Sequence, residues 1–459
     1  MKPPATLTRP SAPAALEPSP AVERIEALLD PATFRPWRSA VGDGVAAGSG
    51  RLGGRRVVIW AQDPTHRGGS LGRAGGETIT RTIDRAQAER VPVVGLVASG
   101  GARLQEGAGA LHAYARIFRA QAVADVPQLS LVVGTCAGGA AYSTSLGDFT
   151  LTVGDGARLF LTGPGVVEKV TREQVTPDEL GGAAVHARNG VAQLHAAGDD
   201  EAAALACELI SHLPDFARGP LPLAAPADPI AGDPSGPVPE ETRRVYDVRD
   251  VAARIVDGGR LLELSPRWAR NMVVGLARMD GLPVGVIANQ PRYLGGTIDA
   301  AGAEKGAWFV SLCDRFGLPL VVLVDTPGFL PGVGQERRGV IRYGADLLDS
   351  FGRATVRRVT VTLRQAYGGA HIVMNSRDLG ADLTLAWPGA ALGVMGPRQA
   401  VGVIERRAIE AGADPDALAA RYEEEHLDVS RAAASGYVDE IVEPSETRPR
   451  ILDALEGVG

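Results

Sequence analysis

Length, composition and charge narrow the classes of protein to which this chain can belong. Its 459 residues are 45% hydrophobic, which is enough for a large core divided between two or three domains. The net charge of −7 and the interspersed charged residues argue against a nucleic-acid-binding protein held by phosphate contacts. No uninterrupted apolar run reaches the roughly 18 to 20 residues needed to span a bilayer. We therefore expect a cytoplasmic protein with neither nucleic acid nor membrane as its partner.

The N-terminal region contains a predicted tail and then a predicted helix. Residues 1–20 are rich in Pro and Ala and lack the apolar core of a signal peptide, so we interpret them as a mobile tail. Apolar residues at helical spacing come next, over Ala21–Asp30. From Arg55 onwards, short apolar runs alternate with helical patterns. The runs "VPVVGLVA" and "VPQLSLVV" predict buried strands, while "GETITRTIDRAQAER" and "GALHAYARIFRAQAVA" predict helices.

A proline-dense segment without periodicity separates the two halves of the chain, between Leu213 and Asp247. The alternation of strands and helices then resumes with "GLPVGVIANQ", "GLPLVVLVDTPGF" and "RRVTVTLRQAYGG". This pattern indicates an α/β protein. We predict an N-terminal domain over 21–225, a linker over 226–245 and a C-terminal domain over 246–459.

The two halves resemble each other, which indicates a duplicated domain. "VPQLSLVVGTCAGGA" from Val126 aligns with "VRRVTVTLRQAYGGA" from Val356, an offset of 230. Further blocks align upstream, where Pro92 and Pro319 differ by 227, and downstream, where Gly163 and Gly396 differ by 233. A repeat of this length is a duplicated fold rather than a solenoid, whose periods are about 20 to 50 residues.

Each half contains a strand that ends in a Gly-Gly-Ala turn, beside a second strand that ends in "SGGAR" or "DTPGF". Backbone N–H groups of such turns, aided by a helix N-terminus, can stabilise a developing negative charge. Glycine allows a substrate to approach the backbone closely. The signatures of P-loop NTPases, dinucleotide-binding folds, serine hydrolases and zinc proteases are all absent from the sequence. The three cysteines are far apart and form no C-x-x-C, so we expect neither a disulfide framework nor a metal site.

Long ordered motifs between about Ala21 and Arg450 resemble the carboxyltransferase (β) subunit of biotin-dependent acyl-CoA carboxylases, of the propionyl-CoA and acetyl-CoA carboxylase type. They are "AQDPTHRGGSLG", "SGGARLQEG", "CAGGAAYS", "NQPRYLGGTID", "DTPGFLPG", "AYGGAHIVM" and "GYVDEIVEPSETR". The resemblance implies two tandem crotonase-like β-β-α superhelix domains and a hexamer built as a trimer of dimers. It also implies an active site between the N-terminal domain of one subunit and the C-terminal domain of its dimer partner.

The same resemblance assigns roles to residues of both turns. Gly138 and Gly139 would bind the thioester carbonyl of an acyl-CoA, and Gly369 and Ala370 the ureido oxygen of biotin. Carboxyl would pass between carboxybiotin and the α-carbon of an acyl-CoA, with an enolate as intermediate. The further substrate-binding residues that it implies are Gly100, Gly101, Ala102, Arg103, Ala140, Tyr142, Gly368, His371 and Ile372.

The lysines bear on the partners of the chain. Lys2, Lys169 and Lys305 are its only lysines, and none has the Met-Lys-Met-like context of a biotin acceptor. If the chain is a carboxyltransferase, its carboxybiotin comes on a carrier protein, and the biotin carboxylase is on another chain.

Several positions depart from the pattern of the family. Gln365 and Thr78 stand where relatives usually have lysine, Ala98 where they have an acidic residue, and Thr135 where they have proline. His371 and Ile372 replace the common Tyr-Asp pair, and the family associates the second position with acyl-chain selection. With these departures, two alternatives stay open. One is a crotonase-superfamily relative that acts as a biotin-independent decarboxylase of malonyl-type thioesters or as another pathway-specific enolate enzyme, and the other is a non-catalytic scaffold subunit.

Some residues near the turns have ordinary structural interpretations. His371 is interpreted either as a packing residue or as a titratable group beside the biotin-side turn. Asp325 is expected to accept hydrogen bonds from turn N–H groups. Cys136 is expected to be a small packing residue. Tyr142 and Tyr367 could line the cleft or pack in the core.

Overall fold

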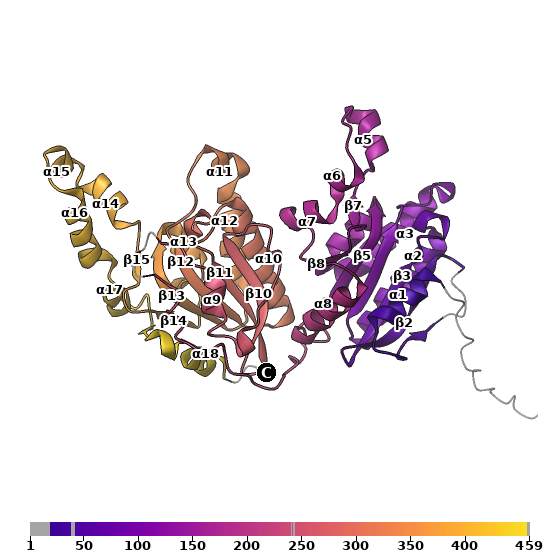
Figure 1. Ribbon diagram of the computed structural model, residues 1–459, viewed down its shortest axis with the longest axis horizontal. Coiled ribbons are helices and arrows are strands. Elements are labelled where there is room, and N and C mark those ends of the chain that lie inside the picture. The colour runs from indigo at the N-terminus through magenta and orange to yellow at the C-terminus, as the bar shows by residue number, and fades with distance from the viewer. Residues whose placement is uncertain (1–18, 38–41, 240, 242–243, 457–459) are drawn as a thin grey trace, which may run out of the picture. The chain divides into compact units, whose positions relative to one another are not determined.

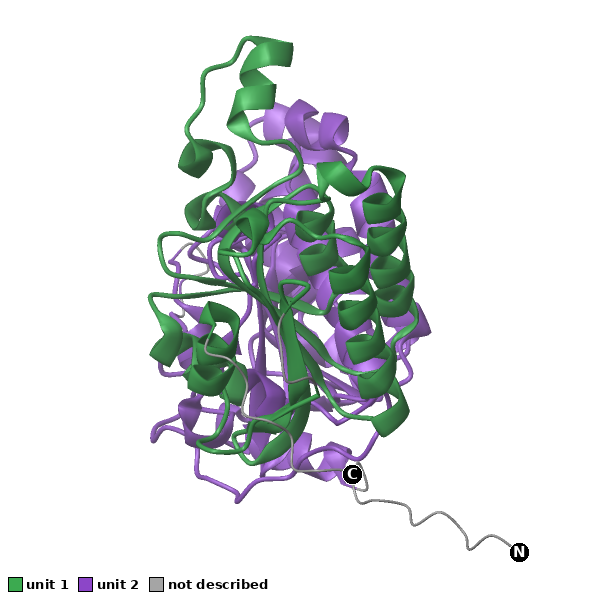
Figure 2. Ribbon diagram, turned by 90° about the vertical axis from the view of Figure 1, so that its right-hand side faces the viewer, with its two compact units in different colours: residues 1–186, 194–207 green, residues 187–193, 208–459 purple. Residues whose placement is uncertain are grey.

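The computed structural model describes residues 19–37, 42–239, 241 and 244–456 (Figure 1). Contacts group the chain into two compact units (Figure 2). Unit 1 contains the described residues up to 186 together with 194–207, and unit 2 contains 187–193 and the described residues from 208 onwards. The predicted tail, residues 1–20, lies outside the described residues except for Ser19 and Pro20, which begin the first helix.

Unit 1 is built on one sheet with the strand order β1-β2-β3-β4-β5-β6-β8. The short strand β7 pairs with the carboxyl end of β5, after the residues of β5 that pair with β6. The pairs β1–β2 and β2–β3 are antiparallel, and all later pairs are parallel. The strands are β1 (Arg35–Pro36), β2 (Val45–Leu52), β3 (Arg55–Gln62), β4 (Val93–Ser99), β5 (Gln128–Ala137), β6 (Phe149–Val153), β7 (Arg158–Phe160) and β8 (Leu194–Ala196).

The first three helices of unit 1 agree with the apolar spacing that predicted them. The long helices α2 and α3 lie side by side (Figure 1). The helices are α1 (Pro20–Leu28), α2 (Arg73–Glu89), α3 (Ala108–Val123), α4 (Gly139–Leu146), α5 (Pro164–Thr171), α6 (Pro177–Gly181), α7 (Ala183–Asn189) and α8 (Asp199–His212), and the last two continue into unit 2.

Unit 2 contains a second sheet with the order β9-β10-β11-β12-β13-β14-β16, with β15 paired to β13. The strands are β9 (Leu262–Glu263), β10 (Met272–Met279), β11 (Leu282–Asn289), β12 (Leu320–Thr326), β13 (Arg358–Tyr367), β14 (Leu383–Ala386), β15 (Ala391–Gly393) and β16 (Glu440–Ile441). The helices are α9 (Val248–Ala252), α10 (Ala300–Phe316), α11 (Val333–Arg338), α12 (Val340–Arg353), α13 (Gly368–Val373), α14 (Pro397–Ile404), α15 (Arg406–Glu410), α16 (Pro415–Tyr422), α17 (Val429–Ala434) and α18 (Thr447–Leu455).

The two sheets have the same topology, strand for strand. In each, two antiparallel pairs made by the first three strands lead into a parallel series, and the fifth strand pairs with a short extra strand at its carboxyl end. The strands β4 and β5 of unit 1 thus correspond to β12 and β13 of unit 2. This confirms the predicted α/β class and the internal duplication.

The proline-dense segment after His212 contains no helix or strand among its described residues. It packs on unit 2 rather than forming a free spacer. Leu221 and Val238 contact the core of that unit, and the N–H of Ala224 donates to the carbonyl of Gly281 at 3.0 Å. The predicted domain limits, 21–225 and 246–459, stay a prediction beside these contact-based units.

No helix within the described ranges is long and apolar enough to cross a membrane.

Lys305 is a buried cation in helix α10. Its Nζ donates to the carbonyls of Ser265 and Trp268, both at 3.0 Å, and so anchors the loop before β10. Burial lowers the pKa of Lys305 to about 8. The unfolded chain, with a lysine pKa of about 10.4, therefore binds more protons than the folded chain between these two pH values.

We expect the free energy of unfolding to increase as the pH rises from 8 to about 10.4. Lys305 alone should contribute about 3 kcal/mol to this increase. The Lys305→Met variant should lack this increase. The difference between the free energies of unfolding of the wild type and the variant should therefore grow with pH. Chemical denaturation of both proteins at pH 7.5 and 10 checks this, with Lys169→Met on the exposed face of α5 as the control. A deficit that is independent of pH would contradict the assignment.

Candidate functional site

Both Gly-Gly-Ala turns come after an irregularity in the parallel sheet. In unit 1 the register runs from Val97↔Val132 to Ser99↔Cys136, so one residue of β4 lies opposite three of β5. In unit 2 the register shifts in the same way, from Val324↔Thr362 to Thr326↔Ala366. Bulges bend a strand and redirect the chain beyond it, and they recur beside active sites. Each turn is therefore presented by a bent strand end at the carboxyl edge of its sheet.

The turn of unit 1 begins at Gly138, whose φ of +59° favours glycine. The N–H of Gly138 donates to the carbonyl of Phe160 at 3.0 Å, within the same unit. Helix α4 starts at the next residue, Gly139. The N–H groups of Gly139 and Ala140 belong to the first helical turn, which has no intrahelical acceptors. The donors of this turn that can serve a ligand are thus at Gly139 and Ala140.

The turn of unit 2 has the same form. Gly368 also has a φ of +59° and begins α13, so the N–H groups of Gly369 and Ala370 lie in its first turn. A methyl group at Gly369 would meet the protein only at the ring of Phe329, 3.6 Å away, which is an ordinary contact. The fold does not require glycine here, so this position leaves room for a ligand to approach the backbone closely.

The neighbouring turn of unit 1, "SGGAR", has its donors engaged within the unit. The N–H of Gly100 donates to the carbonyl of Gly68, and that of Gly101 to Oγ of Ser99. The side chain of Arg103 is only 8% exposed and binds Glu106 at 2.9 Å and the carbonyl of Ser70 at 2.7 Å. These contacts give Arg103 a structural role in holding this turn.

Asp325, at the end of β12, differs from its predicted role. We expected its carboxylate to accept turn N–H groups, and this was wrong. Oδ2 instead accepts the hydroxyl of Tyr246 at 2.8 Å and lies 3.1 Å from Nε of Arg364. The side chain is fully buried, so it cannot reach the exposed turn.

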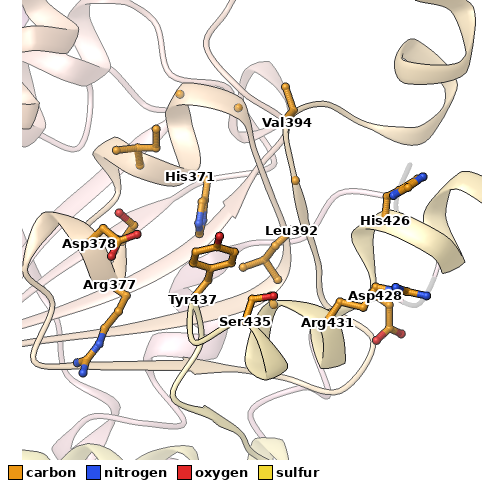
Figure 3. Close-up of a pocket in the computed structure, with 16 residues that line it drawn as sticks. His371, Arg377, Asp378, Leu392, Val394, His426, Asp428, Arg431, Ser435 and Tyr437 are labelled. Atoms are coloured by element: carbon orange, nitrogen blue, oxygen red, sulfur yellow. The ribbon is translucent and has the colours of Figure 1, made fainter. Parts of the chain in front are cut away.

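A cavity of about 620 Å³ lies within unit 2 against the second turn (Figure 3). Gly368, Gly369, His371 and Ile372 come from that turn and from α13, and the opposite wall comes from β15 and from residues near α17. The residues that complete the lining are Ser376, Arg377, Asp378, Leu392, Gly393, Val394, His426, Asp428, Arg431, Ala432, Ser435 and Tyr437. The wall is mainly apolar, with charged groups at its margin.

His371 and Ile372 are both placed in this cavity. Burial lowers the pKa of His371, which the carboxylate of Asp378 partly opposes, so the ring is neutral at pH 7. The described part of the chain supplies no hydrogen bond to that ring. Ile372 is 49% exposed and adds apolar surface.

The other residues near the turns are divided between core and surface. Cys136 is fully buried and Tyr367 packs with Ala391 and Leu427, which confirms packing for both. Tyr142 is 54% exposed, and its ring meets that of Phe118 edge to face. The cavity residues Tyr437, His426 and Arg431 were not predicted, because they lie beyond the repeated blocks. Only Tyr437 had a signal in the sequence, since it falls within the motif "GYVDEIVEPSETR".

The chain is a duplicated α/β protein in which each repeat has a bulged strand that leads through a glycine turn into a helix. The backbone N–H donors of these turns suit a carbonyl oxygen or an oxyanion. No cluster of three or more potential metal ligands occurs among the described residues. A family model, the carboxyl transferase domain, matches residues 19–457. The chain therefore belongs to the carboxyl transferase family.

Similar proteins cover nearly the whole chain. The propionyl-CoA carboxylase carboxyltransferase subunit of Haloferax mediterranei is 44% identical over 94% of this chain and 89% of its own. The methylmalonyl-CoA carboxyltransferase 12S subunit of Propionibacterium freudenreichii subsp. shermanii is 42% identical over 95% and 87%. The crystal structure of the transcarboxylase 12S hexamer with methylmalonyl-CoA bound matches with a TM-score of 0.90 at 40% identity, covering 95% of this chain and 89% of that one. This match confirms the expected fold of two tandem crotonase-type domains.

Proposed function

We propose that the chain transfers a carboxyl group between carboxybiotin and the α-carbon of an acyl-CoA. The observation that carries the proposal is the pair of equivalent glycine turns at the ends of β5 and β13. Each offers preorganised N–H donors where glycine leaves the backbone accessible. The chemistry needs two such donor sets, because negative charge develops both on the thioester oxygen and on the ureido oxygen.

In unit 1 the Gly138–Gly139 turn takes the thioester carbonyl of the acyl-CoA. Since the N–H of Gly138 is bonded to Phe160, Gly139 supplies the available donor, with Ala140 beside it. Both N–H groups point from the start of α4, whose dipole favours negative charge. As the α-proton leaves and the enolate forms, each such hydrogen bond stabilises the oxygen by about 3 to 4 kcal/mol.

In unit 2 the turn at Gly369 and Ala370 takes the ureido oxygen of biotin. The open space where a Cβ of Gly369 would stand and the adjoining apolar cavity fit a compact bicyclic ring with a planar ureido group. When bound, biotin delivers the carboxyl group and its ureido nitrogen accepts the α-proton, so the chain needs no side-chain base. The remaining task of unit 2 is to hold that ring and exclude water.

The partners are part of the same proposal. Exposed apolar residues occupy equivalent positions in the two repeats: Leu111 and Ile341, Tyr142 and Ile372, Leu161 and Val394, Val170 and Val403. We propose that this face of unit 1 covers the same face of unit 2 in a second copy, within a hexamer built as a trimer of dimers. The biotin carrier and the biotin carboxylase are on other chains. The three free cysteines accord with a cytoplasmic location.

The acyl group is acetyl, propionyl or longer, and Ile372 on the cavity wall favours an apolar chain. We assign His371 beside it to packing, because the described residues supply no hydrogen-bond partner that would orient its ring for proton transfer.

We expect His371→Phe to retain biotin-dependent turnover within about threefold at pH 7.5, since a general base would contribute about 10²- to 10⁴-fold. Steady-state rates from pH 6 to 9 check this. A loss of 100-fold, together with loss of the acidic limb of the pH profile, would assign His371 a proton-transfer role.

One assay tests the function. The purified chain is incubated with malonyl-CoA or methylmalonyl-CoA, with and without free biotin, and release of CO2 is followed. Biotin-dependent decarboxylation is the expected result. Turnover without biotin would favour the alternative, a decarboxylase of malonyl-type thioesters, which the loss of lysine at Gln365 and Thr78 also favours. No binding of CoA thioesters by calorimetry would exclude both enzymes and leave a scaffold subunit.

A further inference from the structure

We propose that Asp325, Arg364 and Tyr246 are positioning residues for the glycine turn of unit 2. The proposal rests on the proposed function, because that turn is the biotin-side donor set. None of the three touches the cavity beside the turn. They act through the bulge that precedes it.

The ion pair fills the bulge between β12 and β13. Asp325 is the single residue of β12 opposite Leu363, Arg364 and Gln365, because the paired register stops at Val324 and resumes at Thr326. The Arg364 guanidinium reaches back to the Asp325 carboxylate at 3.1 Å, with both side chains at most 8% exposed. The pairing resumes at Ala366, two residues before Gly368. The pair therefore determines how β13 leaves the sheet and where its turn begins.

Unit 1 contains the same bulge without the ion pair. The residues equivalent to Asp325 and Arg364 are Ala98 and Gly134, at offsets of 227 and 230. A Cβ added at Gly134 would lie 3.2 Å from that of Ala98, so small apolar contacts fill this bulge. One backbone geometry is thus held in two chemically different ways. Because the bulge of unit 1 forms without buried charge, the bulge geometry does not explain the ion pair of unit 2. We therefore assign the ion pair to positioning the glycine turn of that unit.

The pair extends to the segment that joins the two repeats. Tyr246 donates its hydroxyl to Asp325 at 2.8 Å, and its ring lies 5.3 Å from the guanidinium of Arg364. Arg364 also donates to the carbonyl of Arg244 at 2.9 Å and, more weakly, to that of Glu241 at 3.3 Å. The main-chain N–H of Asp325 donates to Asn289 on β11. The network thereby ties three strands and the preceding segment to one point.

Three buried polar atoms in this network lack a hydrogen-bond partner: Oδ1 of Asp325, Nδ2 of Asn289 and Nε of Arg364, whose contact with Asp325 is an ion pair without hydrogen-bond geometry. Burial raises the pKa of Asp325, while Arg364 and Tyr246 favour its ionised form. Buried charge of this kind costs stability unless every contact is made, and hydrophobic replacements are often at least as stable. The buried ion pair behind the turn is therefore better explained by a role in fixing the position of the turn than by a gain in stability.

The test compares two buried ion pairs of the same unit. Asp325→Asn/Arg364→Met removes the charge behind the turn, and Tyr246→Phe removes only one hydroxyl. The control, Asp257→Asn/Arg448→Met, removes a second, largely buried pair, in which the Arg448 side chain is 15% exposed and the paired atoms lie 2.6 Å apart near α18, away from the turn. kcat and KM are measured for biotin-dependent decarboxylation of malonyl-CoA, and amide hydrogen exchange is followed over residues 366–374 and 136–144.

We expect the Asp325/Arg364 double variant to lose at least tenfold in kcat, since a misplacement of about 1 Å can cost 100-fold. KM for malonyl-CoA should stay within twofold, and exchange over 366–374 should accelerate while 136–144 is unchanged. The single variant Arg364→Lys, which keeps the positive charge, should retain more of the wild-type kcat than the double variant does. The control should keep kcat within twofold even if its melting temperature falls.

Equal losses of kcat in the double variant and the control, or an unchanged kcat in the double variant, would overturn the proposal. If the double variant does not fold, Tyr246→Phe decides, with a several-fold loss of kcat as the expected result and no loss as the contrary one. If the wild type shows no biotin-dependent turnover, the proposed function fails. Exchange over 366–374 then still tests the positioning, and an unchanged rate there would overturn it.

Discussion

Replacing Gly369 by valine should abolish biotin-dependent turnover while the fold and the binding of CoA persist. The N–H of residue 369 remains in the variant, but the added side chain occupies the space through which the ureido oxygen approaches. Loss of one oxyanion donor typically costs about 10²- to 10³-fold in kcat. The first added carbon meets only the Phe329 ring at 3.6 Å, and φ at this position is not left-handed, so a Cβ here brings neither clash nor backbone strain.

Gly369→Ala gives a graded version of this prediction. Alanine in a helix is about 0.5 to 1 kcal/mol more favourable than glycine, so the melting temperature should hold or rise slightly while activity falls. Gly352→Ala, on the exposed side of α12 in the same unit, is the matched control and should change neither rate nor CoA affinity. Turnover of Gly369→Val equal to that of the wild type would remove Gly369 from the site.

The sequence predicted the architecture well, because hydrophobic periodicity and repeated blocks are properties that the chain carries locally. The strands ending at Ser99 and Ala137 and the helices α2 and α3 lie where apolar spacing placed them. The duplication, aligned by offsets of 227 to 233, predicted two sheets of equal topology, and the structure has them. Both turns were also located, since glycine pairs after β-forming runs are conspicuous.

The chemistry within the turns could not be predicted, because it depends on which backbone atoms meet across the sheet. The partner of the Gly138 N–H is the carbonyl of Phe160, on a short strand that comes after a whole helix and another strand. The partner of Asp325 is Arg364, which lies 39 residues later and meets it only because of a register shift. No local pattern in the sequence indicates a bulge, so the carboxylate was assigned to the nearest turn.

The two turns, alike in sequence, differ in the atoms that surround their glycines. A methyl group at Gly369 finds room, while one at Gly139 would lie 2.7 Å from two ring carbons of Tyr114. Tyr114 is buried, and its hydroxyl lies 3.3 Å from Oγ of Ser99, so the ring cannot simply move aside. Glycine at 139 therefore serves both packing and the proposed approach of the thioester, and the two roles need separate tests.

We expect Gly139→Ala to lower both stability and turnover. Overpacking of this kind costs about 1 to 3 kcal/mol. Turnover should fall by about 100-fold or more. The N–H of residue 139, the available donor for the thioester oxygen, remains in the variant, but the added methyl group crowds the approach to it. Denaturant unfolding and malonyl-CoA decarboxylation measure the two effects on the same preparation.

A double-mutant cycle with Tyr114→Ala separates the two roles, because alanine at 114 removes every ring atom that the new methyl group would strike. In the Tyr114→Ala background, the stability cost of Gly139→Ala should shrink by about 1 to 3 kcal/mol, a coupling typical of residues in contact. The loss of turnover caused by Gly139→Ala should persist in that background at its full size. If turnover of the double variant instead equals that of Tyr114→Ala, Gly139 is required for packing against Tyr114 and not for the thioester.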